Sequence, residues 1–503
     1  WGFSAFHAAL AYKLTGTAKY ASLAVSQVDA AVTAAQTAAA AGTIPVIASD
    51  SYLDVFEGVR DVTYTLQWCG AQVSAAQQTD WQSYCSQAIF NVWNYNSATW
   101  YGKSFPWSGW STNNPGDNYY YKFIGATSCW ALYSGDKTWL DYMNSDRWPL
   151  LFSYLANVPE GGSREGTGYG LSHKNLFEIY GIWSTSTGTD IQATNKHCLN
   201  SIAYWVHATT PDGAYMAPIG DQARVSDAPI YDYNRTLINE AVNLNSGSGL
   251  APAGRWWGQT YYPTMQNGFN CPYDMLDVSG PANPPSLSSY YAPGAGHYFA
   301  RSDWTSSASF LDFTCGTYSE SHGHQNHGAF DFWGTGGWLA VTENTLTHSG
   351  IQQSTDFHNM VRFEQSGAIV RQSYGMTATA SVTDDQTTLV ANLDMTPMYP
   401  STGISWTRQL SYARPSTLTV SDVCKVPAGT VPYFQLQLPV QPTVTSNGFT
   451  AGKLQVTVVT PAQATITVDN WPVLNSDATS GWRVNISDPA NGGNFVVKLQ
   501  VLP

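Results

Sequence analysis

The chain has 503 residues, too many for one ordinary hydrophobic core, and its length predicts two large domains. Only 11% of the residues are charged, the formal net charge is −13 and no basic run occurs, which argues against a nucleic-acid partner. No apolar stretch approaches the roughly 18–20 residues that span a bilayer, so we expect no membrane segment.

Seven cysteines are dispersed along the chain without a CxxC motif, which excludes a zinc ribbon and a thioredoxin-like motif. Cys69 and Cys85 form the one pair that we consider for a disulfide. The chain begins at Trp1 instead of Met, and it is poor in Lys but rich in Thr, Asn, Tyr and Trp. We therefore expect a secreted or periplasmic protein from which an export signal was removed.

The first half of the chain has apolar residues at intervals of three and four, which predicts helices separated by loops of Gly, Asn, Ser and Pro. The predicted helices are Phe6–Leu14, Tyr20–Ala41, Trp81–Trp93, Tyr119–Leu132, Trp139–Leu155 and Leu176–Ile182. Repeated amphipathic hairpins of this kind favour an (α/α) toroid or incomplete barrel over residues 1–245.

A breaker-rich linker at 246–290 precedes short alternating or β-branched runs, which predict strands. These runs are His297–Ser302, Ser309–Phe313, Thr417–Val423, Tyr433–Leu438, Lys453–Val459, Ala464–Val468, Trp482–Ile486 and Phe495–Val501. Many short strands in succession predict an antiparallel β-sandwich over residues 291–503. The expected fold class is therefore α+β multidomain, with a helical toroid followed by a β-sandwich.

A cluster of histidines is the densest polar feature of the chain. His322, His324 and His327 fall within six residues, directly before a predicted hairpin at 328–341. On an extended segment, alternation would place His322 and His324 on the same side. An imidazole can carry a proton, donate a hydrogen bond or bind a metal near neutral pH. The alternative is a His-rich turn exposed to solvent.

The segment Ser321–Phe330 (SHGHQNHGAF), the hairpin after it and the pair His358-Asn359 resemble the sandwich motifs of the heparinase II/III-like polysaccharide lyases. Glu165–Tyr169 (EGTGY) is similar to the EGxxY element of that family, although taken alone it reads more readily as a helix start. The resemblance implies a helical toroid, a β-sandwich and an active site between them. It also implies an acidic polysaccharide or oligosaccharide as substrate.

The resemblance places a catalytic Asn upstream of EGTGY, where this chain has Asn113, Asn114 and Asn118. The family's Asn-His pair is not seen, so the choice among the three stays open. β-Elimination on a uronate needs neutralisation of the carboxylate, a base for the C5 proton and an acid for O4. We expect Asn114 or Asn118, with His322, to neutralise, Tyr169 to act as acid and also as base, and His322 to be the alternative base.

Aromatic side chains in loops suggest stacking against sugar rings, and charged side chains nearby suggest contacts to uronate groups. The predicted substrate-binding residues are Trp107, Trp110, Tyr119, Glu165, Arg164, Arg224 and Arg301. Because basic residues are sparse, alginate or another unsulfated polyuronate such as glucuronan fits better than a heparin-like polymer.

The resemblance further implies a structural zinc or other divalent ion, although the chemistry requires no cofactor. Matching residue by residue gives His324 and His358 as ligands. The acidic ligand position of the family falls on Thr342, so we take the adjacent Glu343 as the third candidate.

Two other functions remain open. A glycoside hydrolase on an (α/α) barrel would use paired carboxylates, for which Glu160, Glu165, Asp117 and Asp221 are available. A glycan-binding protein without catalysis is the second alternative. The hydrolase reading gives the histidine cluster no role.

Overall fold

The computed structural model describes residues 4–222, 229–261, 279–348 and 351–503, which form two compact units. The first unit contains the described residues up to 156 and those of 172–195, and the second contains the rest. The segment around Tyr169, predicted in the helical domain, thus belongs to the same unit as the strands.

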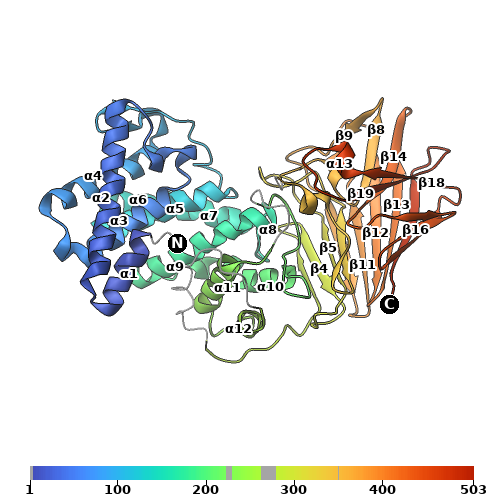
Figure 1. The fold of residues 1–503 in the computed structure, drawn as a ribbon, viewed down its shortest axis with the longest axis horizontal. Coiled ribbons are helices and arrows are strands. Elements are labelled where there is room, and N and C mark those ends of the chain that lie inside the picture. The colour runs from blue at the N-terminus through green and yellow to red at the C-terminus, as the bar shows by residue number, and fades with distance from the viewer. Residues whose placement is uncertain (1–3, 223–228, 262–278, 349–350) are drawn as a thin grey trace. The chain divides into compact units, whose positions relative to one another are not determined.

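The first unit is helical (Figure 1). Its helices are α1 (Ala5–Thr15), α2 (Ala18–Ala41), α3 (Val55–Cys69), α4 (Ala75–Trp93), α5 (Asn118–Ser134), α6 (Lys137–Tyr142), α7 (Trp148–Leu155) and α9 (His173–Thr187). Helix α3 packs against α1 and α5, and α5 also packs against α9. Along α2, small residues at intervals of three and four form the buried face, namely Ala21, Ala24, Val28, Val32, Ala35 and Ala39.

The second unit also contains helices. They are the short α8 (Gly166–Tyr169), α10 (His197–Ala208), α11 (Asp232–Leu244) and α12 (Ala251–Thr260). Helix α12 lies inside the region predicted as a linker. Residues Ala251–Thr260 are helical there despite the Pro and Gly residues around them. Its Pro252 stands in the first turn, where a helix tolerates proline.

The strands of the second unit form three antiparallel sheets (Figure 1). One sheet has the order β3 (Ser289–Ala292), β4 (His297–Arg301), β5 (Phe310–Thr314), β6 (Phe330–Gly334), β7 (Gly337–Ala340). Another has the order β10 (Thr379–Asp384), β11 (Thr388–Asp394), β12 (Ser405–Ala413), β13 (Thr417–Lys425), β20 (Asn494–Val501), β17 (Leu454–Thr460), β16 (Gly448–Ala451), β15 (Thr443–Thr445). The third has the order β18 (Thr465–Asn470), β19 (Trp482–Ser487), β14 (Thr430–Leu438), β8 (Val361–Gln365), β9 (Ala368–Val370).

A single buried cluster draws apolar side chains from all three sheets. Strands β12 and β13 alternate buried and more exposed residues, as expected where one face of a sheet covers a core. The predicted fold class, a helical N-terminal part followed by antiparallel sheets, is confirmed.

Two further predictions concern cysteines and membranes. Cys69 and Cys85 are both buried and free, so the disulfide prediction is wrong. Cys271 lies outside the described residues. No helix in the described part of the chain is both long and apolar enough to cross a bilayer.

A buried ion pair joins two neighbouring strands of the largest sheet. Arg408 on β12 donates from Nε to Oδ1 of Asp422 on β13 at 2.8 Å and from Nη2 to Oδ2 at 2.9 Å. Both side chains are 0% exposed. Arg408 Nη1 also donates to the carbonyl oxygens of Gly328 and Asn359, so the pair fixes the segments on either side of the β6–β7 hairpin.

We expect Asp422→Ala to lower the free energy of unfolding by about 3–5 kcal/mol, because it leaves a buried guanidinium without its counter-charge. Urea unfolding followed by tryptophan fluorescence measures this loss. Lys425→Ala, an exposed change on the same strand, should stay within about 0.5 kcal/mol. Equal effects of the two variants would contradict the assignment.

Candidate active site

The loop that carries His322, His324 and His327, here called the histidine loop, is held by hydrogen bonds to one carboxylate, that of Asp221. His322 Nδ1 lies 2.8 Å from Asp221 Oδ2, and His324 Nε2 lies 2.7 Å from Asp221 Oδ1. Gln353 Nε2 donates to Oδ2 at 3.0 Å, and the Asp221 amide donates to the His322 carbonyl oxygen at 3.0 Å. Burial alone would raise the pKa of Asp221, but hydrogen bonds from His322, His324 and Gln353 outweigh it and lower the pKa.

The two imidazoles differ in exposure. The side chain of His322 is 21% exposed, whereas that of His324 is fully buried. Alternation on an extended strand does not apply, because residues 320–328 form an irregular loop with turns and bends instead of a strand. Both rings still meet the same carboxylate, one at each oxygen, and only His322 keeps access to solvent.

Tyr169 stacks face to face on His322. The ring centroids are 3.4 Å apart and the planes differ by 9°. Both residues are partly exposed. Nδ1 of His322 contacts Asp221, so Nε2 is the ring nitrogen left for a substrate. When the neutral ring carries its proton on Nδ1, Nε2 presents its lone pair.

Close backbone approaches position Tyr169. Thr167 donates from its amide to the Ile219 carbonyl oxygen at 2.8 Å and from Oγ1 to that of Ala217 at 2.6 Å. Gly166 has φ +87°, and a Cβ there would lie 1.9 Å from the Ile219 carbonyl oxygen. Only glycine fits this position, so the EGTGY motif owes its first glycine to the contact with the segment that carries Asp221.

The predicted metal ligands are only partly brought together. His324 Nδ1 and His358 Nε2 lie 3.2 Å apart. Glu343 is fully buried, and burial raises its pKa to about 9. Its carboxyl group faces Gly481, where a Cβ would lie 2.4 Å from Oε2. Among the described residues, no group of three His, Cys, Asp or Glu side chains is arranged to hold a metal ion.

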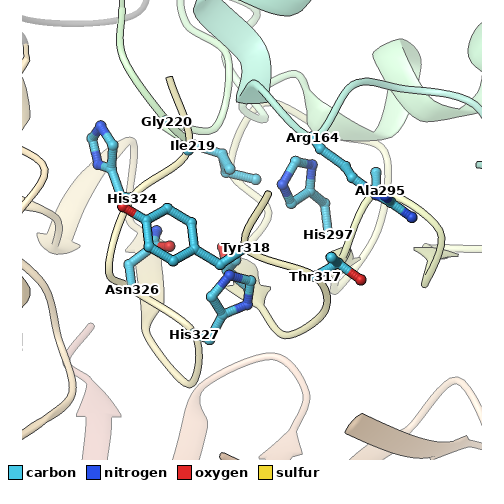
Figure 2. A pocket seen from close by; sticks show the side chains of 12 residues that line it. Arg164, Ile219, Gly220, Ala295, His297, Thr317, Tyr318, His324, Asn326 and His327 are labelled. Carbon is cyan, nitrogen blue, oxygen red and sulfur yellow. The ribbon is translucent and has the colours of Figure 1, made fainter. Parts of the chain in front are cut away.

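A small cavity lies beneath the histidine loop (Figure 2). Its volume is about 10 Å³, room for about one water molecule, and Arg164, His297, Tyr318 and His327 are among its lining residues. Burial lowers the pKa of His327 to about 4, and burial with His327 and Arg164 nearby lowers that of His297 to about 3. Both are therefore neutral at physiological pH, and His327 Nδ1 accepts a hydrogen bond from the Gly316 amide at 3.0 Å.

The predicted asparagines and aromatic residues belong to the first unit. Asn113 Oδ1 accepts from Arg147 at 3.3 Å, Asn114 Oδ1 accepts from the Gly116 amide at 3.1 Å, and Asn118 is buried in the first turn of α5. Their role in neutralising a carboxylate stays a prediction.

The predicted aromatic residues differ in accessibility. Trp107 donates from Nε1 to the Asn91 carbonyl oxygen at 2.9 Å and is partly buried. Tyr119 donates to Asp50 Oδ1 at 3.0 Å, and Trp110 is 49% exposed. Trp110 is therefore the most accessible of the three for stacking against a sugar.

The arginines are less available than predicted. Arg301 is 1% exposed and donates to two backbone carbonyl groups at the end of α10, at 2.6 and 3.0 Å, so its substrate role finds no support. Arg164 donates to the carbonyl oxygens of Gly294 and Asn157 at 2.9 and 3.2 Å while remaining partly exposed. Arg224 lies outside the described residues.

The carboxylates of the hydrolase alternative are mostly committed elsewhere. Asp117 caps α5 by accepting from the Tyr119 amide, Glu165 is fully buried and Asp221 binds two imidazoles. The substrate-binding role predicted for Glu165 finds no support for the same reason. Sequence reasoning missed the role of Asp221, because its histidine partners stand 101 and 103 residues away.

Behind the site, Asp312 on β5 and Asp331 on β6 are directly paired across the strands. Burial and the nearby Asp331 raise the pKa of Asp312 well above its ordinary value. Burial raises the pKa of Asp331 to about 7, although Thr342 and Asn359 donate hydrogen bonds to it. The folded state therefore favours protonation of the Asp312 and Asp331 carboxyl groups.

We expect Gly166→Ala to lower the free energy of unfolding by about 3–5 kcal/mol, because the new Cβ collides with a backbone oxygen that cannot move cheaply. Gly429→Ala is the matched control, since Gly429 has φ +81° with nothing within 4 Å of the added Cβ. It should cost about 1–2 kcal/mol from backbone strain alone. Thermal unfolding compares them, and equal losses would contradict the close approach at Ile219.

The acidic pair predicts a pH dependence. A carboxyl group with a raised folded-state pKa stabilises the fold below its unfolded value of about 4, and this contribution is lost as the pH rises through about 7. Asp312→Asn removes one of the two ionisations. We expect the melting temperature of Asp312→Asn, measured by calorimetry and expressed relative to that of the wild type, to rise between pH 5 and 8. For the exposed Asp80→Asn the difference from the wild type should stay constant. Parallel curves for Asp312→Asn would refute this assignment.

Sequence comparisons identify no relative. No protein-family model matches the chain, and no curated protein sequence matches it either.

Solved structures do match the chain over nearly its whole length. Heparinase III has a TM-score of 0.67 at 11% identity, with 99% of this chain and 75% of that chain covered. The heparan sulfate lyase HepC from Pedobacter heparinus has a TM-score of 0.63 at 13% identity, with 98% and 74% covered. The heparinase III BT4657 gene product has a TM-score of 0.64 at 12% identity, with 99% and 77% covered. At these identities the likeness concerns the fold, and this chain has the fold of the heparinase III-type polysaccharide lyases.

Proposed function

We propose that this chain is a polysaccharide lyase that cleaves a uronate-containing polysaccharide by β-elimination. The observation that carries the proposal is the stacked pair of Tyr169 and His322, held by Asp221 and partly open to solvent. The fold shared with heparinase III and heparan sulfate lyase structures supports it.

The pair supplies the proton transfers that the reaction needs. His322 donates from Nδ1 to the Asp221 carboxylate, which orients the ring and supports an imidazolium if one forms. Tyr169 contributes a phenol in contact with that ring, and a phenol can both donate and accept a proton. In our proposal Tyr169 protonates O4 and His322 or Tyr169 removes the C5 proton. Asn114 or Asn118 neutralises the uronate carboxylate together with His322.

For the substrate, we favour an unsulfated polyuronate such as alginate or glucuronan. Sulfate groups require clustered cations, whereas this chain carries a formal net charge of −13. Arg301 is buried, and Arg164 already donates to two carbonyl groups. The structural neighbours are named for heparin and heparan sulfate, so heparan sulfate belongs in the test as the competing substrate.

A lyase leaves 4,5-unsaturated uronate ends, which absorb ultraviolet light, whereas a hydrolase leaves reducing ends without that absorbance. We expect the wild-type protein to produce the absorbance from alginate or glucuronan and little from heparan sulfate. Reducing ends without absorbance on every polymer would refute the lyase and favour the hydrolase, and binding without cleavage would favour a glycan-binding protein.

On the polymer that is cleaved, Tyr169→Phe should lower kcat by about 10²- to 10⁴-fold, because it removes the proton donor and keeps the ring. Tyr20→Phe, a partly exposed tyrosine of α2, is the matched control and should leave kcat unchanged. Retained kcat in Tyr169→Phe would remove this residue from the mechanism.

A further inference from the structure

Two buried imidazoles face each other at the position where the resemblance implies a metal ion. His324 Nδ1 and His358 Nε2 are 3.2 Å apart. A metal would need lone pairs from both nitrogens and at least one further oxygen, nitrogen or sulfur ligand. The residues that surround the pair decide whether such a ligand exists.

The third ligand does not fit. Thr342, at the acidic position of the family, contacts Nδ1 of His358 at 2.9 Å, the ring nitrogen that does not face His324. Asn344 Oδ1 accepts from the Gln352 amide at 3.1 Å. Its NH₂ group is thereby turned toward His324 Nδ1 at 3.1 Å, and a donor cannot ligate a metal. The carboxyl group of Glu343 faces Gly481 and so does not take that place.

The same contacts form a complete directed chain of hydrogen bonds. The Thr342 hydroxyl donates to His358 Nδ1 at 2.9 Å, and His358 Nε2 donates to His324 Nδ1 at 3.2 Å. His324 Nε2 donates to Asp221 Oδ1 at 2.7 Å. His322 Nδ1 donates to the other oxygen, Oδ2, at 2.8 Å. Each imidazole then carries one proton, and it lies on the nitrogen that donates: Nε2 in His358, Nε2 in His324 and Nδ1 in His322.

The direction of the chain depends on the Thr342 hydroxyl, which also lies 3.1 Å from the Phe357 carbonyl oxygen. If the hydroxyl donated there, His358 Nδ1 would carry the proton, and the bare Nε2 would face the bare Nδ1 of His324. Two lone pairs at 3.2 Å repel each other. The shorter contact, to His358, is also the one that leaves no such clash.

We propose that Thr342, His358, His324 and Asp221 form a metal-free hydrogen-bonded chain that positions His322. The chain fixes the tautomer of each ring from its buried end, Thr342, to its accessible end, His322. Partners that orient a metal-bound imidazole typically contribute about 10- to 100-fold to activity, and by analogy we expect a similar contribution here. The four residues are positioning residues, and only this contribution to catalysis rests on the proposed lyase function.

Metal content tests the chain without reference to activity. Purified wild-type protein, incubated with zinc, manganese or calcium and then dialysed, should retain no stoichiometric metal by mass spectrometry. Zinc should also leave its melting temperature unchanged. Asn344→Asp is the matched probe, because it replaces the inward NH₂ with a carboxylate oxygen and should raise zinc uptake. Exposed Asn447→Asp should behave as wild type.

Nuclear magnetic resonance of ¹⁵N-labelled histidine gives a second independent readout. His324 and His358 should both carry their proton on Nε2, assigned by comparison with His324→Gln and His358→Gln. One tightly held metal ion per wild-type chain, or a bare Nε2 on His358, would overturn the proposal.

Kinetics test the positioning role. Thr342→Val should lower kcat by about 10- to 100-fold with little change in KM or melting temperature, and Thr342→Ser, which keeps the hydroxyl, should restore kcat. Equal kcat values for the Val and Ser variants would overturn the positioning role. If the wild type cleaves no polymer, the proposed function fails. Metal content and histidine tautomers still decide whether the hydrogen-bonded chain from Thr342 to Asp221 exists.

Discussion

The Asp221 carboxylate is the constraint on which the arrangement of the site depends. Removing a carboxylate from water is unfavourable unless hydrogen bonds replace the lost solvation. Asp221 receives them from His322, His324 and Gln353, on two segments that are distant in sequence. The resulting charge is fixed in place before any substrate arrives, which is the condition for effective electrostatic support of a reaction. Gly166 allows the segment bearing Tyr169 to pack against the segment bearing Asp221.

Much of the fold follows from local periodicity, and the failures have physical causes. The run Trp482–Ile486 alternates and became β19 (Trp482–Ser487), and Tyr20–Ala41 became most of α2. Helix α10 was missed although Cys198, Ile202 and Trp205 recur at helical spacing, so here too the periodicity was present. Helix α3 does have a stripe of buried apolar residues, so the signal was present and was overlooked.

The site was predictable only where a motif marks it. Motifs singled out Tyr169 and His322, which the structure brings into contact. Nothing in the spacing identified Asp221 as their organising partner, since sequence does not reveal which carboxylate a distant loop will meet. Sequence likewise does not reveal that Arg301 on β4 is buried and donates to two carbonyl oxygens at the end of α10, so its predicted substrate role gains no support from the structure. The pairing of Asp312 with Asp331 likewise depends on strand register.

The stacked rings have a stereochemical consequence. Two rings in face-to-face contact, with centroids 3.4 Å apart, leave no room for a sugar between them. In the proposed reaction, Tyr169 and His322 must therefore approach a bound uronate from one side. Removal of the C5 proton and protonation of O4 would then occur on the same face, which is a syn elimination. Such a site distinguishes C5 epimers, because inversion at C5 carries the proton to the face that neither ring can reach.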